Sequence, residues 1–206
     1  MEEPHQKSHL GQNTQIPVVI SILGRPGSGK GTQCRLLSQK FNLSHISIGD
    51  VLREEMERGE ESPHADIIRA NMLAGTIGPV EITMAILKDR IAKLMEGGTR
   101  VFILDGFPRS IEQSTHFQTL IGPITFLILL QCSRETSFHR LLPRGRFDDQ
   151  TQAIRNRLLT FETTTSLVVD DFRKHGKLTV VDAEPSVAKI HEELVTIISS
   201  VAELLH

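Results

Sequence analysis

Residues 17–32 read PVVISILGRPGSGKGT, an apolar run followed by a glycine-rich loop and the start of a helical pattern. The run at 17–23 is rich in β-branched residues, which predicts a strand buried on both faces, as in a parallel sheet. A glycine-rich loop that leads from such a strand into a helix, with Lys30 near its end, is typical of a phosphate-binding loop (P-loop). Its glycines let backbone N–H groups converge on anionic oxygens at the positive end of the helix. The alternative, a glycine-rich turn that only joins strand to helix, has no use for the lysine.

The rest of the chain alternates short apolar runs with helical patterns. This alternation predicts one domain over residues 17–206 with a three-layer α/β/α fold and a five-stranded parallel sheet. Residues 1–16 are polar and are expected to form a tail outside this domain. The expected strands lie at 17–23, 44–47, 101–104, 124–130 and 177–181.

The connection between the second and third strands is longer than one crossover helix requires. Residues 49–79 are therefore interpreted as a small helical insert that projects over the sheet edge. Within it, Ser62 is expected to cap a helix whose first residue is Pro63 and which ends at Gly75.

Composition excludes several function classes. The 206 residues carry a formal net charge of −2, and every aromatic residue is Phe, so neither a broad basic footprint nor Trp or Tyr stacking platforms exist for nucleic acid. The apolar runs are far shorter than the ~18 residues of a membrane span. Two cysteines, Cys34 and Cys132, form no disulfide framework and are expected to be small buried residues in a reducing compartment, the cytoplasm or the nucleus. No Cys/His group has zinc-finger spacing.

Five motifs, in order along the chain, carry a resemblance to a known family. They are GRPGSGKGTQC at 24–34, HISIGDVLR at 45–53, GPVEIT at 78–83, DGFPR at 105–109, and RGRFDD at 144–149 followed by Arg157. Together they resemble the adenylate kinases and UMP–CMP kinases, which are nucleoside monophosphate kinases, and they span nearly the whole chain. The resemblance implies transfer of the γ-phosphoryl group of ATP, with Mg²⁺, to a nucleoside monophosphate by a monomeric protein.

The residue types fit that chemistry. The attacking group is an already ionised phosphate oxygen, so the reaction needs charge neutralisation and in-line positioning rather than a carboxylate base. Arginine forks suit phosphate oxygens, and the motifs supply arginines from separate segments.

The resemblance also implies roles for individual residues. It places ATP at Gly27, Ser28, Gly29, Lys30, Gly31, Thr32, Arg140 and Arg144. It places the monophosphate at Ile48, Arg53, Gly78, Gly106, Arg109, Gln113, Arg146 and Arg157. It assigns catalysis to Lys30, Arg140, Arg144 and Arg157, and magnesium, through water, to Asp105 with Asp50 as a second candidate. Asp148 and Asp149 are expected to hold the lid arginines by ion pairs.

Some positions depart from the family pattern. The lid at 143–149 is very short, because only Gly145 separates Arg144 from Arg146. Ile48, Thr76 and Gly78 also differ from the usual residues around the acceptor. The PVEIT segment and the short lid favour UMP or CMP narrowly, whereas Gln113 resembles the base-reading glutamine of adenylate kinases and keeps AMP as an alternative acceptor.

Two further functions stay open on the sequence alone. A nucleotide-binding regulator that has lost turnover would explain the short lid and Thr76, but it would not need all of the retained cations. A P-loop kinase for another small metabolite is the third hypothesis, and the HISIGDVLR motif argues against it.

Overall fold

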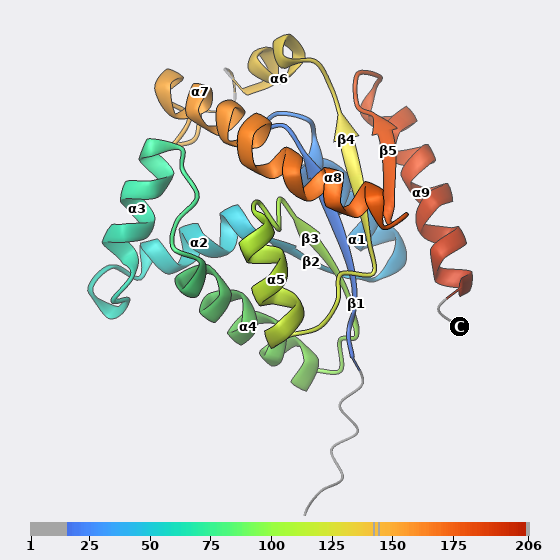
Figure 1. Ribbon diagram of the computed structural model, residues 1–206, viewed down its shortest axis with the longest axis horizontal. Helices are drawn as coiled ribbons and strands as arrows, with labels where there is room; N and C mark the ends of the chain where they lie inside the picture. The colour runs from blue at the N-terminus through green and yellow to red at the C-terminus, as the bar shows by residue number, and fades with distance from the viewer. Residues whose placement is uncertain (1–15, 142, 144, 205–206) are drawn as a thin grey trace, which may run out of the picture.

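A five-stranded parallel sheet forms the centre of the protein (Figure 1). The structure, a computed structural model, describes residues 16–141, 143 and 145–204. The strand order is β2-β3-β1-β4-β5, with the glycine-rich loop following the central strand. The fold class and all five strands predicted from the sequence are confirmed. The strands are β1 (Val18–Gly24), β2 (Ser44–Ser47), β3 (Val101–Asp105), β4 (Phe126–Gln131) and β5 (Leu178–Asp182).

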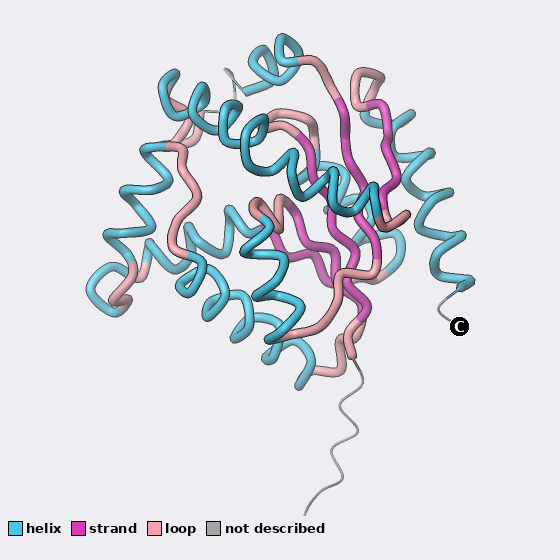
Figure 2. Tube along the Cα trace, in the orientation of Figure 1, coloured by secondary structure: helices cyan, strands magenta, loops and turns pink. Residues whose placement is uncertain are grey.

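Helices cover both faces of the sheet and extend beyond its edge (Figures 1 and 2). α1 and α9 pack on one face, and α4, α5 and α8 pack on the other. The helices are α1 (Lys30–Phe41), α2 (Ile48–Glu57), α3 (Ala65–Ala74), α4 (Val80–Glu96), α5 (Ile111–Leu120), α6 (Arg134–Leu141), α7 (Thr151–Thr160), α8 (Ser166–Lys174) and α9 (Val187–Leu204), with a 3-10 turn at Gly59–Glu61 and a π-helical turn at Phe161–Thr165. Within the described part of the chain, no helix is both long and apolar enough to cross a membrane.

Side chains of β1 alternate between two hydrophobic clusters. Val19 and Leu23 belong to the cluster under α4, α5 and α8, whereas Ile20 and Ile22 belong to the cluster under α1 and α9. All four are almost fully buried, and burial of each contributes about 1.5–3 kcal/mol. The central strand is thus packed from both sides, which fixes the position of the loop that leaves its carboxyl end.

The segment between β2 and β3 contains the extra helices predicted there, with one correction. α3 begins at Ala65 with His64 at its N-cap, two residues later than predicted. The hydroxyl of Ser62 instead accepts from the backbone N–H of His64 (3.2 Å) and donates to Glu55 of α2 (2.6 Å). Ser62 therefore ties the turn to the preceding helix, and Pro63 lies in that turn.

The C-terminal end of α3 lies directly against α7. Asn156 of α7 donates to the carbonyl oxygen of Ala74 (2.7 Å). Gly75 ends α3 with φ of 70°, and a Cβ atom there would clash with the carbonyl oxygen of Ala153. The two helices thus approach at backbone distance, which holds the 49–79 segment beside α7 (Figure 1).

Candidate active site

A cavity of about 750 Å³ opens at the carboxyl ends of the strands, where ligands bind in open parallel sheets. Every predicted site residue within the described ranges lines it, although these residues come from segments far apart in the sequence. Arg144 lies outside the described residues. Those lining the cavity are Gly27, Ser28, Gly29, Lys30, Gly31, Thr32, Ile48, Asp50, Arg53, Gly78, Asp105, Gly106, Arg109, Gln113, Arg140, Arg146 and Arg157.

The glycine-rich loop takes a backbone conformation that only glycine adopts readily. Gly27 and Gly29 have φ of 86° and 93°, and a side chain on Gly27 would clash with the carbonyl oxygen of Ser137 in α6. Gly29 is the N-cap of α1, and Lys30 is the first residue of that helix. The loop therefore presents the N-terminus of α1 to the cavity, as anion binding requires.

The ammonium group of Lys30 is held by the loop itself. Nζ donates to the carbonyl oxygens of Gly24 (2.8 Å) and Arg25 (2.9 Å). Burial lowers the pKa of Lys30 from 10.5 to about 8, while the nearby Asp105 carboxylate opposes the shift. The lysine is thus positioned by the backbone and poorly compensated in charge, so an anion beside it would stabilise its protonated form.

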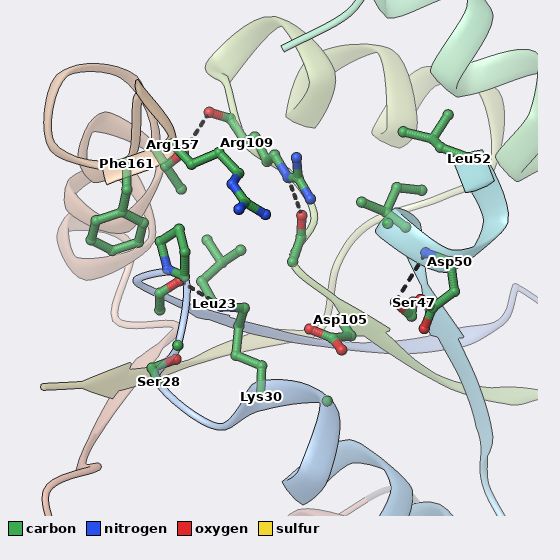
Figure 3. A pocket seen from close by; sticks show the side chains of 18 of the residues that line it. Leu23, Ser28, Lys30, Ser47, Asp50, Leu52, Asp105, Arg109, Arg157 and Phe161 are labelled. Atoms are coloured by element: carbon green, nitrogen blue, oxygen red, sulfur yellow. Dashed lines mark hydrogen bonds between the residues drawn. The ribbon is translucent and has the colours of Figure 1, made fainter. Parts of the chain in front are cut away.

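Arg109 follows β3 in a tightly bonded loop. Its Nε donates to the carbonyl oxygen of Gly106 (2.9 Å), and its own backbone N–H donates to Oε1 of Gln113 (2.9 Å). Its carbonyl oxygen accepts from the hydroxyl of Thr165 (3.0 Å). Burial lowers the pKa of Arg109, and Asp105 opposes that shift. In Figure 3, the side chains of Arg109, Arg157 and Lys30 reach into the same space from three different segments: the loop after β3, α7 and α1.

Two acidic residues hold Arg157 in place, as the sequence predicted. Arg157 donates to Oδ2 of Asp148 (3.1 Å) and to Oδ1 of Asp149 (2.7 Å). Asp148 is only 3% exposed, and the same Oδ2 lies 3.9 Å from Arg53 of α2. The carboxylate of Asp148 therefore joins an arginine of the 49–79 segment to an arginine of α7.

Asp50 forms a second link of this kind. Its Oδ1 accepts from Arg53 and lies 3.8 Å from a guanidinium nitrogen of Arg146. Partial burial raises the pKa of Asp50, but hydrogen bonds with Arg53 and Ser47 outweigh it, so the pKa lies below its ordinary value. Asp50 is thus engaged with two arginines.

Arg140 is directed differently from the other predicted arginines. Although it lines the cavity, its guanidinium group donates to the carbonyl oxygens of Ala183 (2.8 Å) and Glu184 (3.1 Å) in the loop between β5 and α9. Its side chain therefore borders the loop end of the cavity, and its predicted role in phosphoryl transfer remains a prediction.

Sequence reasoning missed the contribution of the π-helical turn at 161–165. This turn places Phe161 and Thr165 on the cavity wall and lets the Thr165 hydroxyl bond the Arg109 carbonyl. π-helical turns often occur at functional sites. The FETTT sequence carries no local signal for one, because the turn depends on packing against a loop that is distant in the sequence.

Comparisons with known proteins agree with this geometry. The family model described as adenylate kinase matches residues 22–177. Adenylate kinase isoenzyme 1 of Caenorhabditis elegans is 38% identical over 179 residues, covering 85% of this chain and 84% of the relative. UMP-CMP kinase of Lentinula edodes is 34% identical over 214 residues (98% and 92%), and uridylate kinase of Schizosaccharomyces pombe is 36% identical over 182 residues (86% and 95%).

The matched region contains the glycine-rich loop, most residues that line the cavity and the arginines around it. Relatives above 30% identity span most of the chain, and their names include both adenylate and pyrimidine nucleotide kinases. From the loop geometry, the clustered cations and these similarities together, we conclude that the chain belongs to the adenylate kinase family.

Proposed function

We propose that this protein is an ATP-dependent nucleoside monophosphate kinase, with UMP and CMP slightly favoured over AMP as the acceptor. The observation that carries the proposal is the convergence of Lys30, Arg53, Arg109 and Arg157 on one cavity. Two substrates that each carry phosphate repel each other, so they meet end to end only where cations surround both. A chain with a net charge of −2 achieves this by concentrating its cations in the cleft.

The arrangement suggests how the phosphoryl group is transferred. The backbone N–H groups of the loop and Lys30 hold the ATP phosphates at the N-terminus of α1. Arg53 and Arg109 bind the phosphate of the acceptor, and Arg157, with Arg140 and Arg144, stabilises the charge on the group in transit. Because the acceptor oxygen is already ionised, positioning and charge neutralisation are the main contributions required of the protein.

The cavity also suits a magnesium ion bound with ATP. Asp105 at the end of β3 and Thr32 of α1 both line it, and a Cβ atom on Gly31 would lie 3.2 Å from Oδ2 of Asp105. These are hard oxygen donors next to the phosphate loop, the type that magnesium prefers. Asp105 would hold the ion through water, and the ion would supply charge neutralisation for the transferring phosphates.

Two segments complete the proposed site. Residues 49–79 are the proposed monophosphate-binding insert, and the sequence at 143–149 is the proposed very short lid. The ion pairs from Asp50 and Asp148 join the insert to the lid edge and α7. Closure of such segments excludes water from the transferring group.

Gln113 is the proposed reader of the acceptor base. Its Oε1 accepts from the Arg109 N–H (2.9 Å), which orients the amide. The Nε2 group has no hydrogen-bond partner among the described residues and is the end left to donate. It can donate to the O4 acceptor of uracil, the N3 acceptor of cytosine or the N1 acceptor of adenine.

A panel of acceptors tests the proposal. Purified protein is incubated with ATP·Mg²⁺ and each of AMP, UMP, CMP, GMP and dTMP, and the diphosphates are quantified, with Lys30→Ala as the inactive control. We expect the highest kcat/KM with UMP or CMP. A clear preference for AMP would reverse the acceptor assignment. Tight ATP binding without product from any acceptor would support a nucleotide-binding regulator instead.

A further inference from the structure

At the wall of the cavity, three metal-ligating side chains meet that are far apart in the sequence. They are Cys34 of α1, His45 of β2 and Asp105 of β3, and one donor atom of each lies within 4.8 Å of the other two. β2 and β3 are neighbouring parallel strands in which His45 pairs with Ile103, so His45 and Asp105 share a face of the sheet. α1 covers that face and brings Cys34 to it.

The donor atoms have few other partners. Cys34 is fully buried and is a free thiol. Nε2 of His45 is buried and lies 3.5 Å from Oδ2 of Asp105, but it makes no hydrogen bond within the described residues. A buried imidazole nitrogen without a hydrogen bond is unusual in a folded protein and calls for an explanation such as a bound ion.

We propose that Cys34, His45 and Asp105 form a binding site for a soft divalent cation such as Zn²⁺. One sulfur, one imidazole nitrogen and one carboxylate oxygen are the donor types that zinc prefers. In a tetrahedral site with bonds of about 2.0–2.3 Å, donor atoms lie about 3.3–3.8 Å apart. The separation of His45 and Asp105 already matches, and Cys34 needs only a small side-chain movement.

The charges also balance in this site. Binding displaces the thiol proton of Cys34 to solvent, and the resulting thiolate together with the Asp105 carboxylate neutralises the two positive charges of the ion. A neutral buried cluster avoids the cost of an isolated buried charge. Lys30, which lies near both acidic ligands, repels any cation that these ligands coordinate directly, and the strong affinity of a thiolate for zinc offsets that repulsion.

The consequence for activity rests on the proposed function. His45 and Asp105 line the cavity, so the ion enters from the side where ATP binds. Once coordinated directly, Asp105 is no longer available to hold a magnesium ion through water. The site therefore makes the kinase sensitive to zinc, and magnesium in excess does not reverse the inhibition readily.

Metal binding is tested first without reference to activity. Co²⁺ is titrated into the full-length protein, and thiolate-to-cobalt charge-transfer absorption is recorded for the wild type, Cys34→Ala and Cys132→Ala. Cys132 is the matched control, because it is the other buried free cysteine. We expect the absorption band in the wild type and in Cys132→Ala, and its loss in Cys34→Ala. A wild-type protein without the band, or a band that survives in Cys34→Ala, would overturn the proposal.

Zinc inhibition of diphosphate formation is the second measurement. We expect Cys34→Ala to raise the zinc concentration for half-inhibition at least tenfold over the wild type and Cys132→Ala. Equal zinc sensitivity of all three proteins contradicts the inhibitory role, because zinc would then act on ATP or elsewhere. If Cys34→Ala folds poorly, His45→Gln provides the same comparison. A protein that has no kinase activity but shows the cobalt band supports the metal site and rejects the proposed function.

Discussion

The two ends of the cavity are held in place by different kinds of interaction. At the loop end, residues 24–32, Lys30 is fixed by backbone carbonyl oxygens. At the opposite end Arg53, Arg146 and Arg157 are held by Asp50, Asp148 and Asp149, and we call these six residues the arginine cluster. We expect the backbone contacts to persist when substrate binds, whereas a carboxylate can yield its arginine to a phosphate. The loop end is therefore expected to be preorganised, and the arginine cluster to exchange partners.

The sharpest test of this difference is removal of the charge at the loop end. Lys30→Ala should lower kcat by about two to three orders of magnitude, as loss of a donor aimed at developing charge does elsewhere. Initial rates of diphosphate formation measure it. Lys40→Ala is the control, because Lys40 is exposed in the last turn of the same helix. A Lys30→Ala variant with more than a tenth of the normal rate would contradict the role of this lysine.

A variant at Arg109 distinguishes binding of the acceptor from binding of ATP. Arg109→Ala should lower kcat/KM for the monophosphate about ten- to a hundredfold, since a hydrogen bond to a charged group is worth about 1.5–3 kcal/mol. The dissociation constant of ATP, measured by calorimetry, should barely change. The bonds to Gln113 and Thr165 use the backbone of residue 109, so the variant retains them. The control is Arg155→Ala, an exposed position in α7, and equal losses for both variants would refute the assignment.

The arginine cluster is tested through its buried acid. Asp148→Asn keeps the volume of the side chain but removes the charge that Arg157 and Arg53 share. We expect kcat/KM to fall about tenfold, which corresponds to about 1.4 kcal/mol, and the urea midpoint of unfolding to fall as well. Asp170→Asn, at an exposed position paired with Arg173, should leave both values unchanged. A fully active Asp148→Asn variant would show that the charge of Asp148 is not needed to position Arg157.

The smallest predicted effect is a pH dependence of the dissociation constant of ATP, which arises from the titration of Lys30. The pKa of Lys30 is about 8 in the free protein, and a bound triphosphate raises it, so ATP binding takes up a proton at higher pH. From pH 8 to 9 the dissociation constant of ATP should rise about fivefold. Lys30→Arg should abolish this rise, because a guanidinium group stays protonated throughout. An unchanged slope in Lys30→Arg would assign the titration to another group.

The same titration predicts how stability changes with pH. The pKa of Lys30 is about 8 in the folded protein and 10.5 when unperturbed. Between pH 8 and 10.5, Lys30 is protonated to a greater extent in the unfolded state than in the folded state. The contribution of Lys30 to the free energy of unfolding of the ligand-free protein therefore rises with pH across this window. Urea unfolding at pH 8 and 10, for the wild type and Lys30→Ala, measures the difference.

The loop end could be predicted from the sequence, because its structure follows from local features. An apolar strand, glycines and a lysine in adjacent positions specify both the turn and its charge, and parallel strands bring their carboxyl ends to one edge. The approach of Arg53, Arg109 and Arg157 followed only from the family resemblance. No local pattern predicts a partner that lies dozens of residues away.

Two features of the site were beyond sequence reasoning. Cys34 and His45 have no metal-site spacing along the chain, and only the pairing of β2 with β3 beneath α1 brings them to Asp105. The start of α3 was also predicted too early. A serine followed by a proline is as typical of a turn as of a helix start, and here Ser62 and Pro63 form a turn. In both cases the local sequence is compatible with more than one structure, and contacts with distant residues determine which one forms.

The backbone contact between Gly75 and Ala153 makes one glycine responsible for how α3 and α7 fit together. A Cβ atom at position 75 would clash with the carbonyl oxygen of Ala153, and the positive φ of Gly75 is itself unfavourable for any other residue. Even Gly75→Ala would therefore have to displace α3 from α7 or distort the turn that ends α3, and the cavity wall to which Gly75 belongs would change with it.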